Sequence, residues 1–177
     1  MKKQNLIKRM ALSAVFAALI GISTTIAPIH IPATGGYVHL GDGFVLLAGF
    51  VLGPVWGAAA AAIGSSAADL YYAAFTYVPA TFIIKGLVAA VASLISSLLK
   101  GRKAGAKMLG YAAGGVVGEL IMVAGYFAYE AVLFSAAGAV VAIPLNLLQA
   151  ASGVIISLLL VGPLMKIKYI RELIAVD

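Results

Sequence analysis

Long uncharged stretches alternate with short basic clusters along this chain of 177 residues. No Asp, Glu, Lys or Arg lies between Glu130 and Lys166, and none lies between Asp42 and Asp69. A helix needs roughly 20 mostly apolar residues to cross the hydrocarbon core of a bilayer. Both stretches are long enough, so the pattern predicts an integral membrane protein. Its few interior charges become the first candidates for function.

The apolar runs, with the Pro and Gly residues that interrupt them, predict a single all-α membrane domain over residues 1–177. We expect a bundle of six transmembrane helices, at about residues 6–27, 41–52, 55–71, 79–99, 107–134 and 142–165. The helix over 41–52 is short for a full span. It is separated from the next helix by Gly53-Pro54, and the two could instead form one kinked hairpin. An outer loop containing Tyr37 and His39 follows the first helix.

Basic residues form three clusters, and membrane proteins keep such clusters on the cytoplasmic side. The clusters are Lys2, Lys3, Lys8 and Arg9; Lys100, Arg102, Lys103 and Lys107; and Lys166, Lys168 and Arg171. Both termini are therefore expected in the cytoplasm, with an even number of crossings between clusters. The net charge of +6 is explained by topology and does not indicate a nucleic-acid partner.

Several chemistries have no basis in this sequence. The chain has no cysteine, which excludes disulfides, thiolate metal sites and cysteine nucleophiles. It has no G-x-x-x-x-G-K-[ST], H-E-x-x-H or G-x-S-x-G motif, and its two histidines make a poor metal site. We therefore expect neither an enzyme nor an ATPase, and no cofactor or metal.

Ionisable and amide side chains inside the predicted helices are the candidate ligand residues. Lys85 lies about one and a half turns into its helix, where it could face a ligand or form a structural ion pair with Asp69 or Asp42. Asp42 could also cap a helix. The polar groups gather towards the outer halves of the later helices, which predicts a small-molecule pocket open to the outside.

Two further groups share helix faces. Glu119, Tyr126 and Glu130 are spaced by seven and four residues, so they form a polar stripe on one helix. Asn146 and Gln149 are three residues apart on the last helix. Either group could bind a ligand, and either could instead hydrogen-bond between helices.

The first helix carries a stripe of small residues. Ala14 and Ala18 lie one turn apart on one face, which suits close packing of another helix, either within this bundle or from a partner protein.

Four segments resemble the substrate-binding S component of energy-coupling factor (ECF) vitamin transporters: residues 36–42 (GYVHLGD), 52–57 (LGPVWG), 64–69 (GSSAAD) and 79–86 (PATFIIKG). Within that group the chain is most similar to the branch for riboflavin, vitamin B6 compounds and hydroxymethylpyrimidine. The resemblance implies six helices with cytoplasmic termini. It also implies that Ala14 and Ala18 form the A-x-x-x-A motif that contacts the membrane coupling subunit.

The resemblance implies a function as well: capture of a small aromatic vitamin from outside the prokaryotic cell membrane, for uptake driven by a coupling subunit and two ATPase subunits. We expect a vitamin B6-type compound first, with hydroxymethylpyrimidine or riboflavin next. The expected ligand residues are Tyr37 and His39 in a lid loop, with Lys85, Glu119, Tyr126, Glu130, Asn146 and Gln149. The alternative is a stand-alone proton-coupled carrier with Glu119 or Asp69 as the proton site.

Overall fold

The computed structural model describes residues 2–26, 28–99, 101–168 and 170. In this part of the chain the elements are α1 (Lys2–Thr25), β1 (Ile29–Ile31), β2 (Gly36–Val38), α2 (Asp42–Tyr71), α3 (Val78–Ser97), α4 (Ala104–Leu133) and α5 (Ala136–Leu164). All five helices contain a stretch that is long and apolar enough to cross a membrane. The all-α membrane class is therefore confirmed, apart from one short β-hairpin.

The expected count of six helices is wrong, because the segments at 41–52 and 55–71 belong to a single element, α2. Its axis is broken at Gly53, whose φ of 84° and ψ of 178° are non-helical and strongly favour glycine. A Cβ placed on Gly57 would lie 2.7 Å from the carbonyl oxygen of Ala48. Nine residues of straight helix would separate these positions by ~13.5 Å. The chain therefore folds back on itself within α2.

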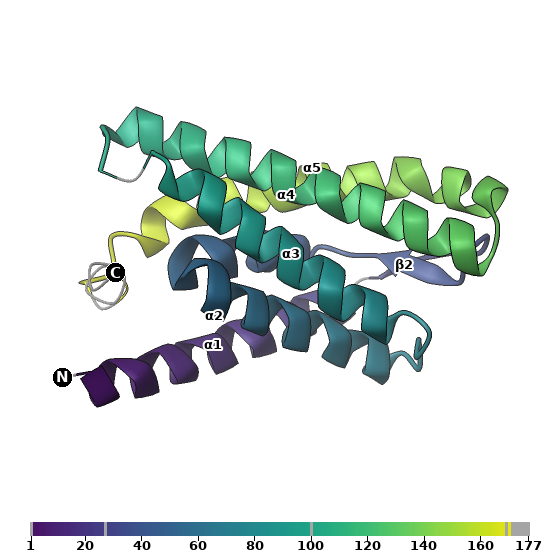
Figure 1. The fold of residues 1–177 in the computed structure, drawn as a ribbon, viewed down its shortest axis with the longest axis horizontal. Coiled ribbons are helices and arrows are strands. Elements are labelled where there is room, and N and C mark those ends of the chain that lie inside the picture. Colours follow the sequence, from purple (N-terminus) through teal and green to yellow (C-terminus); the bar gives the residue numbers. More distant parts are fainter. Residues whose placement is uncertain (1, 27, 100, 169, 171–177) are drawn as a thin grey trace.

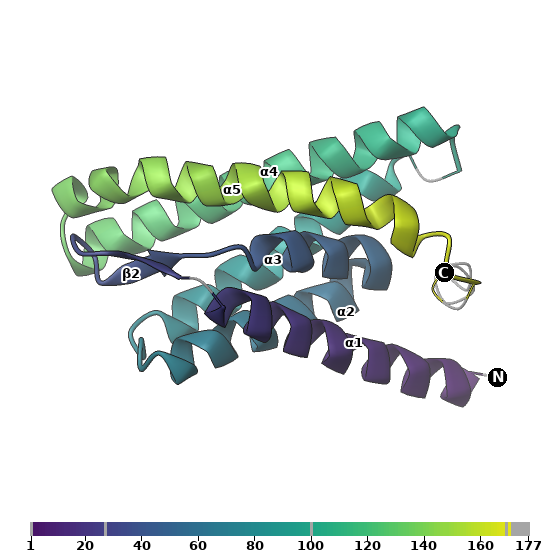
Figure 2. The same ribbon diagram turned by 180° about the vertical axis from the view of Figure 1, so that it is seen from behind.

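This reversal determines where the ends of the helices lie. In both views, the start of α1, the α3–α4 connection and the end of α5 are at one end of the bundle, and the β-hairpin and the α4–α5 turn are at the other (Figures 1 and 2). Five helices return to the starting end only because α2 turns back. The described basic residues Lys8, Arg102 and Lys166 lie in these three segments. Lys100 and Arg171 of the predicted clusters lie outside the described residues.

Some boundaries differ from the prediction. The predicted end of the first helix, residue 27, lies outside the described residues, and α5 begins at Ala136 rather than near residue 142. The Ser135 Oγ accepts a hydrogen bond from the backbone N–H of Gly138 at 3.0 Å. This N-cap lets α5 begin at Ala136, earlier in the chain than predicted. Pro144 therefore falls inside the helix. The outer loop forms an antiparallel pair of strands, with His30 opposite Tyr37.

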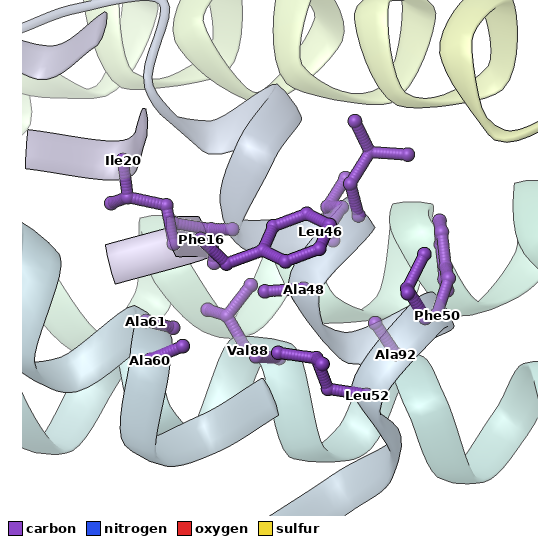
Figure 3. Close-up of a cluster of buried hydrophobic side chains, with 14 of the residues drawn as sticks. Phe16, Ile20, Leu46, Ala48, Phe50, Leu52, Ala60, Ala61, Val88 and Ala92 are labelled. Carbon is purple, nitrogen blue, oxygen red and sulfur yellow. The ribbon is translucent and has the colours of Figure 1, made fainter. Parts of the chain in front are cut away.

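The centre of the bundle is α2, which packs against α1, α3 and α5, while α4 packs against α3 and α5. Buried apolar side chains from these helices form one continuous cluster, and part of it is drawn in Figure 3. There Phe16 and Ile20 of α1 face Leu46 and Ala48 of α2, and Val88 of α3 lies beside them. This core fixes the helices whose far ends carry the polar residues described next.

Candidate functional site

A polar cleft opens at the end of the bundle that carries the β-hairpin. Its walls come from the hairpin, the end of α2, the start of α3, the end of α4 and the first half of α5. The lining residues are Ile31, Gly36, Tyr37, His39, Ser65, Asp69, Tyr77, Thr81, Tyr126, Glu130, Asn146 and Gln149. Segments far apart in sequence thus bring aromatic rings, carboxylates and amides together. Such convergent polar groups in a concave site are typical of small-molecule pockets.

The cleft is narrow in this conformation. Its unoccupied space is about 420 Å³ when the part open to solvent is included, but only about 20 Å³ is open to the centre of a water molecule. That is enough for one or two waters. A ligand with an aromatic ring therefore enters only if part of the wall moves. The hairpin is the wall that is not helical, and its backbone packs only lightly against the helices, with β2 approaching α5.

Tyrosine hydroxyls hold the two carboxylates of the cleft. Tyr37 donates a hydrogen bond to Asp69 Oδ1 at 2.6 Å, and the Tyr77 hydroxyl, with one proton to donate, lies 3.0 Å from both Glu130 Oε1 and the carbonyl oxygen of Thr34. Burial raises the pKa of Tyr37 well above its ordinary value, and the neighbouring Asp69 adds to the effect. Burial also raises the pKa of Tyr77. Both phenols therefore stay protonated at neutral pH, as donors to a carboxylate must be.

Tyr126 completes the aromatic wall. Its hydroxyl lies 2.9 Å from the Thr81 Oγ1, and its ring lies 6.3 Å from the ring of Tyr77, centroid to centroid. The Lys85 ammonium is 5.4 Å from the Tyr126 ring centroid. Tyr126 therefore stands between the cleft and the charged cluster below it.

A buried charged cluster forms the floor of the cleft. The Lys85 Nζ lies 2.5 Å from Asp42 Oδ1, and both side chains are essentially inaccessible to solvent. Gln149 donates from Nε2 to Asp42 Oδ2 at 2.6 Å, and its Oε1 accepts the backbone N–H of His39 at 2.7 Å. Gln149 thus belongs to both the cleft and the floor, and it connects the ion pair to the hairpin.

His39 links the hairpin to the start of α2. Its Nδ1 accepts the backbone N–H of Gly41 at 3.0 Å, one of the donors that a helix start leaves without an intrahelical partner. Burial lowers the pKa of His39 to about 4, and Lys85 acts in the same direction. The imidazole is therefore neutral at pH 7, which suits its role as an acceptor.

Glu119 of α4 lies deeper still. It is 1% exposed, and neither carboxylate oxygen has a hydrogen-bond partner among the described residues. A Cβ placed on Gly153 would lie 2.9 Å from the Asp42 Cβ and 3.2 Å from Glu119 Oε1, so both acids pack against the same side of this glycine. A buried carboxyl without a donor is stable only when it is protonated or paired with a cation.

The structure places six of the eight predicted ligand residues in the cleft: Tyr37, His39, Tyr126, Glu130, Asn146 and Gln149. Lys85 and Glu119 are buried below it and do not line it. The sequence left open whether Lys85 faces a ligand or forms an ion pair, and in the structure it pairs with Asp42. Ala14 and Ala18 are exposed on α1.

The prediction missed several residues of the wall, among them Asp69, Tyr77 and Thr81 as direct lining groups. The sequence held a signal for two of them. Ser65 and Asp69 are four residues apart and share one face of α2, and Thr81 lies one turn before Lys85 on α3. In the described part of the chain, no three His, Asp or Glu side chains gather as metal ligands would.

Comparison with known proteins matches the chain to a family, to a curated relative and to a solved structure. Residues 4–166 match the family described as "ECF-type riboflavin transporter, S component". An uncharacterised protein of Pyrococcus woesei, from the gap 3' region, is 33% identical over 141 residues, which cover 77% of this chain and 88% of that protein. A solved structure, described in "Structure and mechanism of the S component of a bacterial ECF transporter", superposes with a TM-score of 0.63 at 20% identity. The match covers 94% of this chain and 98% of the other.

Proposed function

Because the chain belongs to the family of ECF-type riboflavin transporter S components, we propose that it captures a small aromatic vitamin or vitamin precursor for ATP-driven uptake by an ECF complex. Membership confirms the resemblance seen in residues 36–86. It makes the protein a multi-pass membrane subunit of a transporter and not an enzyme. The partners in this proposal are a membrane coupling subunit and two ATPase subunits.

The observation that carries the proposal is the cleft, which lies at the end of the bundle opposite the start of α1 and the end of α5. Tyr37, Tyr77 and Tyr126 supply aromatic rings to the lining, which suits an aromatic ligand, and the Asn146 amide can both donate to and accept from the edge of a heterocycle. In the proposed orientation both termini are cytoplasmic, so the cleft faces outwards. A vitamin B6-type compound is the favoured ligand, with hydroxymethylpyrimidine or riboflavin next.

The hairpin acts as a lid in this proposal. With room for only one or two waters, the cleft must widen before a ring can enter, and Tyr37 and His39 belong to the segment that would move. Lys85 and Glu119 would influence the ligand indirectly: neither lines the cleft, and Gln149 connects the Lys85–Asp42 ion pair to it.

Reconstitution tests the proposal directly. Small molecules released from the purified protein are identified by mass spectrometry, and uptake is then measured in liposomes with and without the coupling and ATPase subunits. We expect a bound aromatic vitamin and ATP-dependent uptake that needs all the subunits. Uptake by the isolated chain under a proton gradient would instead favour the proton-coupled carrier, for which the unpartnered Glu119 is the supporting observation.

Docking on the coupling subunit is tested separately on α1. Ala14→Trp with Ala18→Trp places two large rings on the exposed small-residue face, which should abolish ATP-dependent uptake and leave vitamin affinity within about twofold. Leu19→Trp is the matched control, since Leu19 is also exposed on α1 but lies on another face. Equal uptake by the two variants would exclude this face as the docking surface.

A further inference from the structure

Two buried carboxylates of the cleft each keep one oxygen free. Asp69 is 4% exposed and Glu130 is 2% exposed, and both line the cleft. Tyr37 donates to one oxygen of Asp69, and one oxygen of Glu130 lies 3.0 Å from the Tyr77 hydroxyl, which also approaches the carbonyl oxygen of Thr34. The second oxygen of each, Oδ2 and Oε2, has no hydrogen-bond partner in the part of the chain that the structure describes. Two buried acceptors are therefore left unsatisfied on residues that line the cleft.

The described residues that line the cleft include no cation to balance the carboxylates of Asp69 and Glu130. No Lys or Arg is among the described residues that line the cleft. The nearby Lys85 ammonium is committed to Asp42, at 2.5 Å, and His39 uses its Nδ1 as an acceptor. An anionic group is stable in a buried place only with a partner of opposite charge or with several donors.

The aromatic residues point to the same ligand chemistry. The rings of Tyr37, Tyr77 and Tyr126 belong to the wall that contains both acids. Tyrosine faces attract cations, and a carboxylate binds a protonated amine with a short, charge-assisted hydrogen bond. Rings and carboxylates together form a recognition site for a positively charged group.

From this we infer that the cleft selects a one-ring aromatic ligand that carries a protonated amine, bound between the free oxygens of Asp69 and Glu130. The inference rests on the proposed function of the cleft as the vitamin site and names its substrate class. An uncharged ligand leaves the two acids without a counter-charge. A phosphorylated ligand is repelled by them.

Matched ligand pairs test the inference on the unmodified protein. Pyridoxamine differs from pyridoxine by an aminomethyl group in place of a hydroxymethyl group, and 4-amino-5-aminomethyl-2-methylpyrimidine differs from its 5-hydroxymethyl counterpart in the same way. Titration calorimetry on the purified chain in micelles at pH 7.5 measures all four, with riboflavin and pyridoxamine 5'-phosphate as neutral and anionic probes. We expect the amine of at least one pair to bind about 30-fold tighter than its alcohol, or about 2 kcal/mol.

Isosteric variants then locate the selectivity. Asp69→Asn and Glu130→Gln keep size and hydrogen bonding but remove the charge, so the amine preference should fall below about threefold in the double variant while alcohol affinity changes little. Ser66→Ala is the matched control. Ser66 is buried three residues before Asp69 on α2 but does not line the cleft, so its variant should keep the full preference.

The outcomes separate this inference from the proposed function. Equal affinities within both pairs, no binding of either amine, or tighter binding of riboflavin or of the phosphate would overturn the inference. So would an amine preference that survives in the double variant. Import of riboflavin by the assembled complex would leave the proposed function intact. A strong amine preference without any import by that complex would support the inference and contradict the proposed function.

Discussion

Replacing Lys85 by methionine removes the cation that faces Asp42 and keeps most of the side-chain volume. The two charges are 2.5 Å apart and shielded from solvent, and among the described residues Gln149 is the side-chain donor that Asp42 keeps after the change. Removing one partner of a buried pair costs about 3–5 kcal/mol, because the other charge is left uncompensated. Asp42 can limit this loss by binding a proton. For an aspartate of ordinary pKa near 3.9, that costs about 4 kcal/mol at pH 7.

We therefore expect Lys85→Met to lower the free energy of unfolding by about 3–4 kcal/mol at pH 7, measured by titration with dodecyl sulfate in mixed micelles without ligand. The double variant Asp42→Asn with Lys85→Met removes both charges and should recover at least about 2 kcal/mol of this loss. Lys103→Met, at an exposed lysine between α3 and α4, is the control and should change stability by less than about 0.5 kcal/mol. If Lys85→Met is as stable as the unmodified protein but no longer binds vitamin, the ammonium serves the ligand and the structural interpretation is wrong.

Two further changes test other parts of the structure. The pKa of His39 is lowered to about 4 in the folded protein, so only the unfolded chain takes up this proton between about pH 6.5 and pH 4. As the pH falls over that range, the free energy of unfolding of the unmodified protein should decrease by about 3 kcal/mol more than that of His39→Gln, measured in parallel acid titrations. Equal pH profiles of the two proteins would contradict the burial of a neutral imidazole. Gly64→Ala places a Cβ 2.4 Å from the carbonyl oxygen of Ala17, which forces α1 away from α2 and should lower the free energy of unfolding by about 1–3 kcal/mol. Gly162→Ala, where a Cβ meets open space, should be neutral or slightly stabilising, and a similar loss in both variants would show that packing between α1 and α2 is not the cause.

The bundle was predictable because a bilayer leaves few choices for an apolar chain. Uncharged stretches of spanning length must become helices, and their number and order follow from where charges and prolines interrupt them. The count of six was wrong because the segments on either side of Gly53 fold back on each other within one element, α2, and this reversal depends on the backbone angles of one residue. The early start of α5 depends on a serine cap that an apolar sequence pattern does not show.

The site was predictable wherever a polar residue had no other reason to lie in a membrane helix. Glu130, Asn146 and Gln149 were found in this way, and all three line the cleft. Pairing between helices could not be read from the sequence, because it depends on how the helices are rotated about their axes. The sequence alone allowed Lys85 to pair with either Asp42 or Asp69. In the structure Lys85 pairs with Asp42, so the described lining of the cleft contains Asp69 and Glu130 but no lysine.

The break at Gly53 has a consequence for how far a nutrient has to be moved. The first half of α2 runs only from Asp42 to the break, and at a rise of ~1.5 Å per residue it covers ~17 Å, about half of a ~30 Å hydrocarbon core. The first half of α2 is therefore too short to span the core, and Gln149, which contacts Asp42 at its start, also lines the cleft. In the proposed transport role, a nutrient bound in the cleft lies next to a helix that begins partway along the bundle, and the distance it still has to move is shorter by that depth.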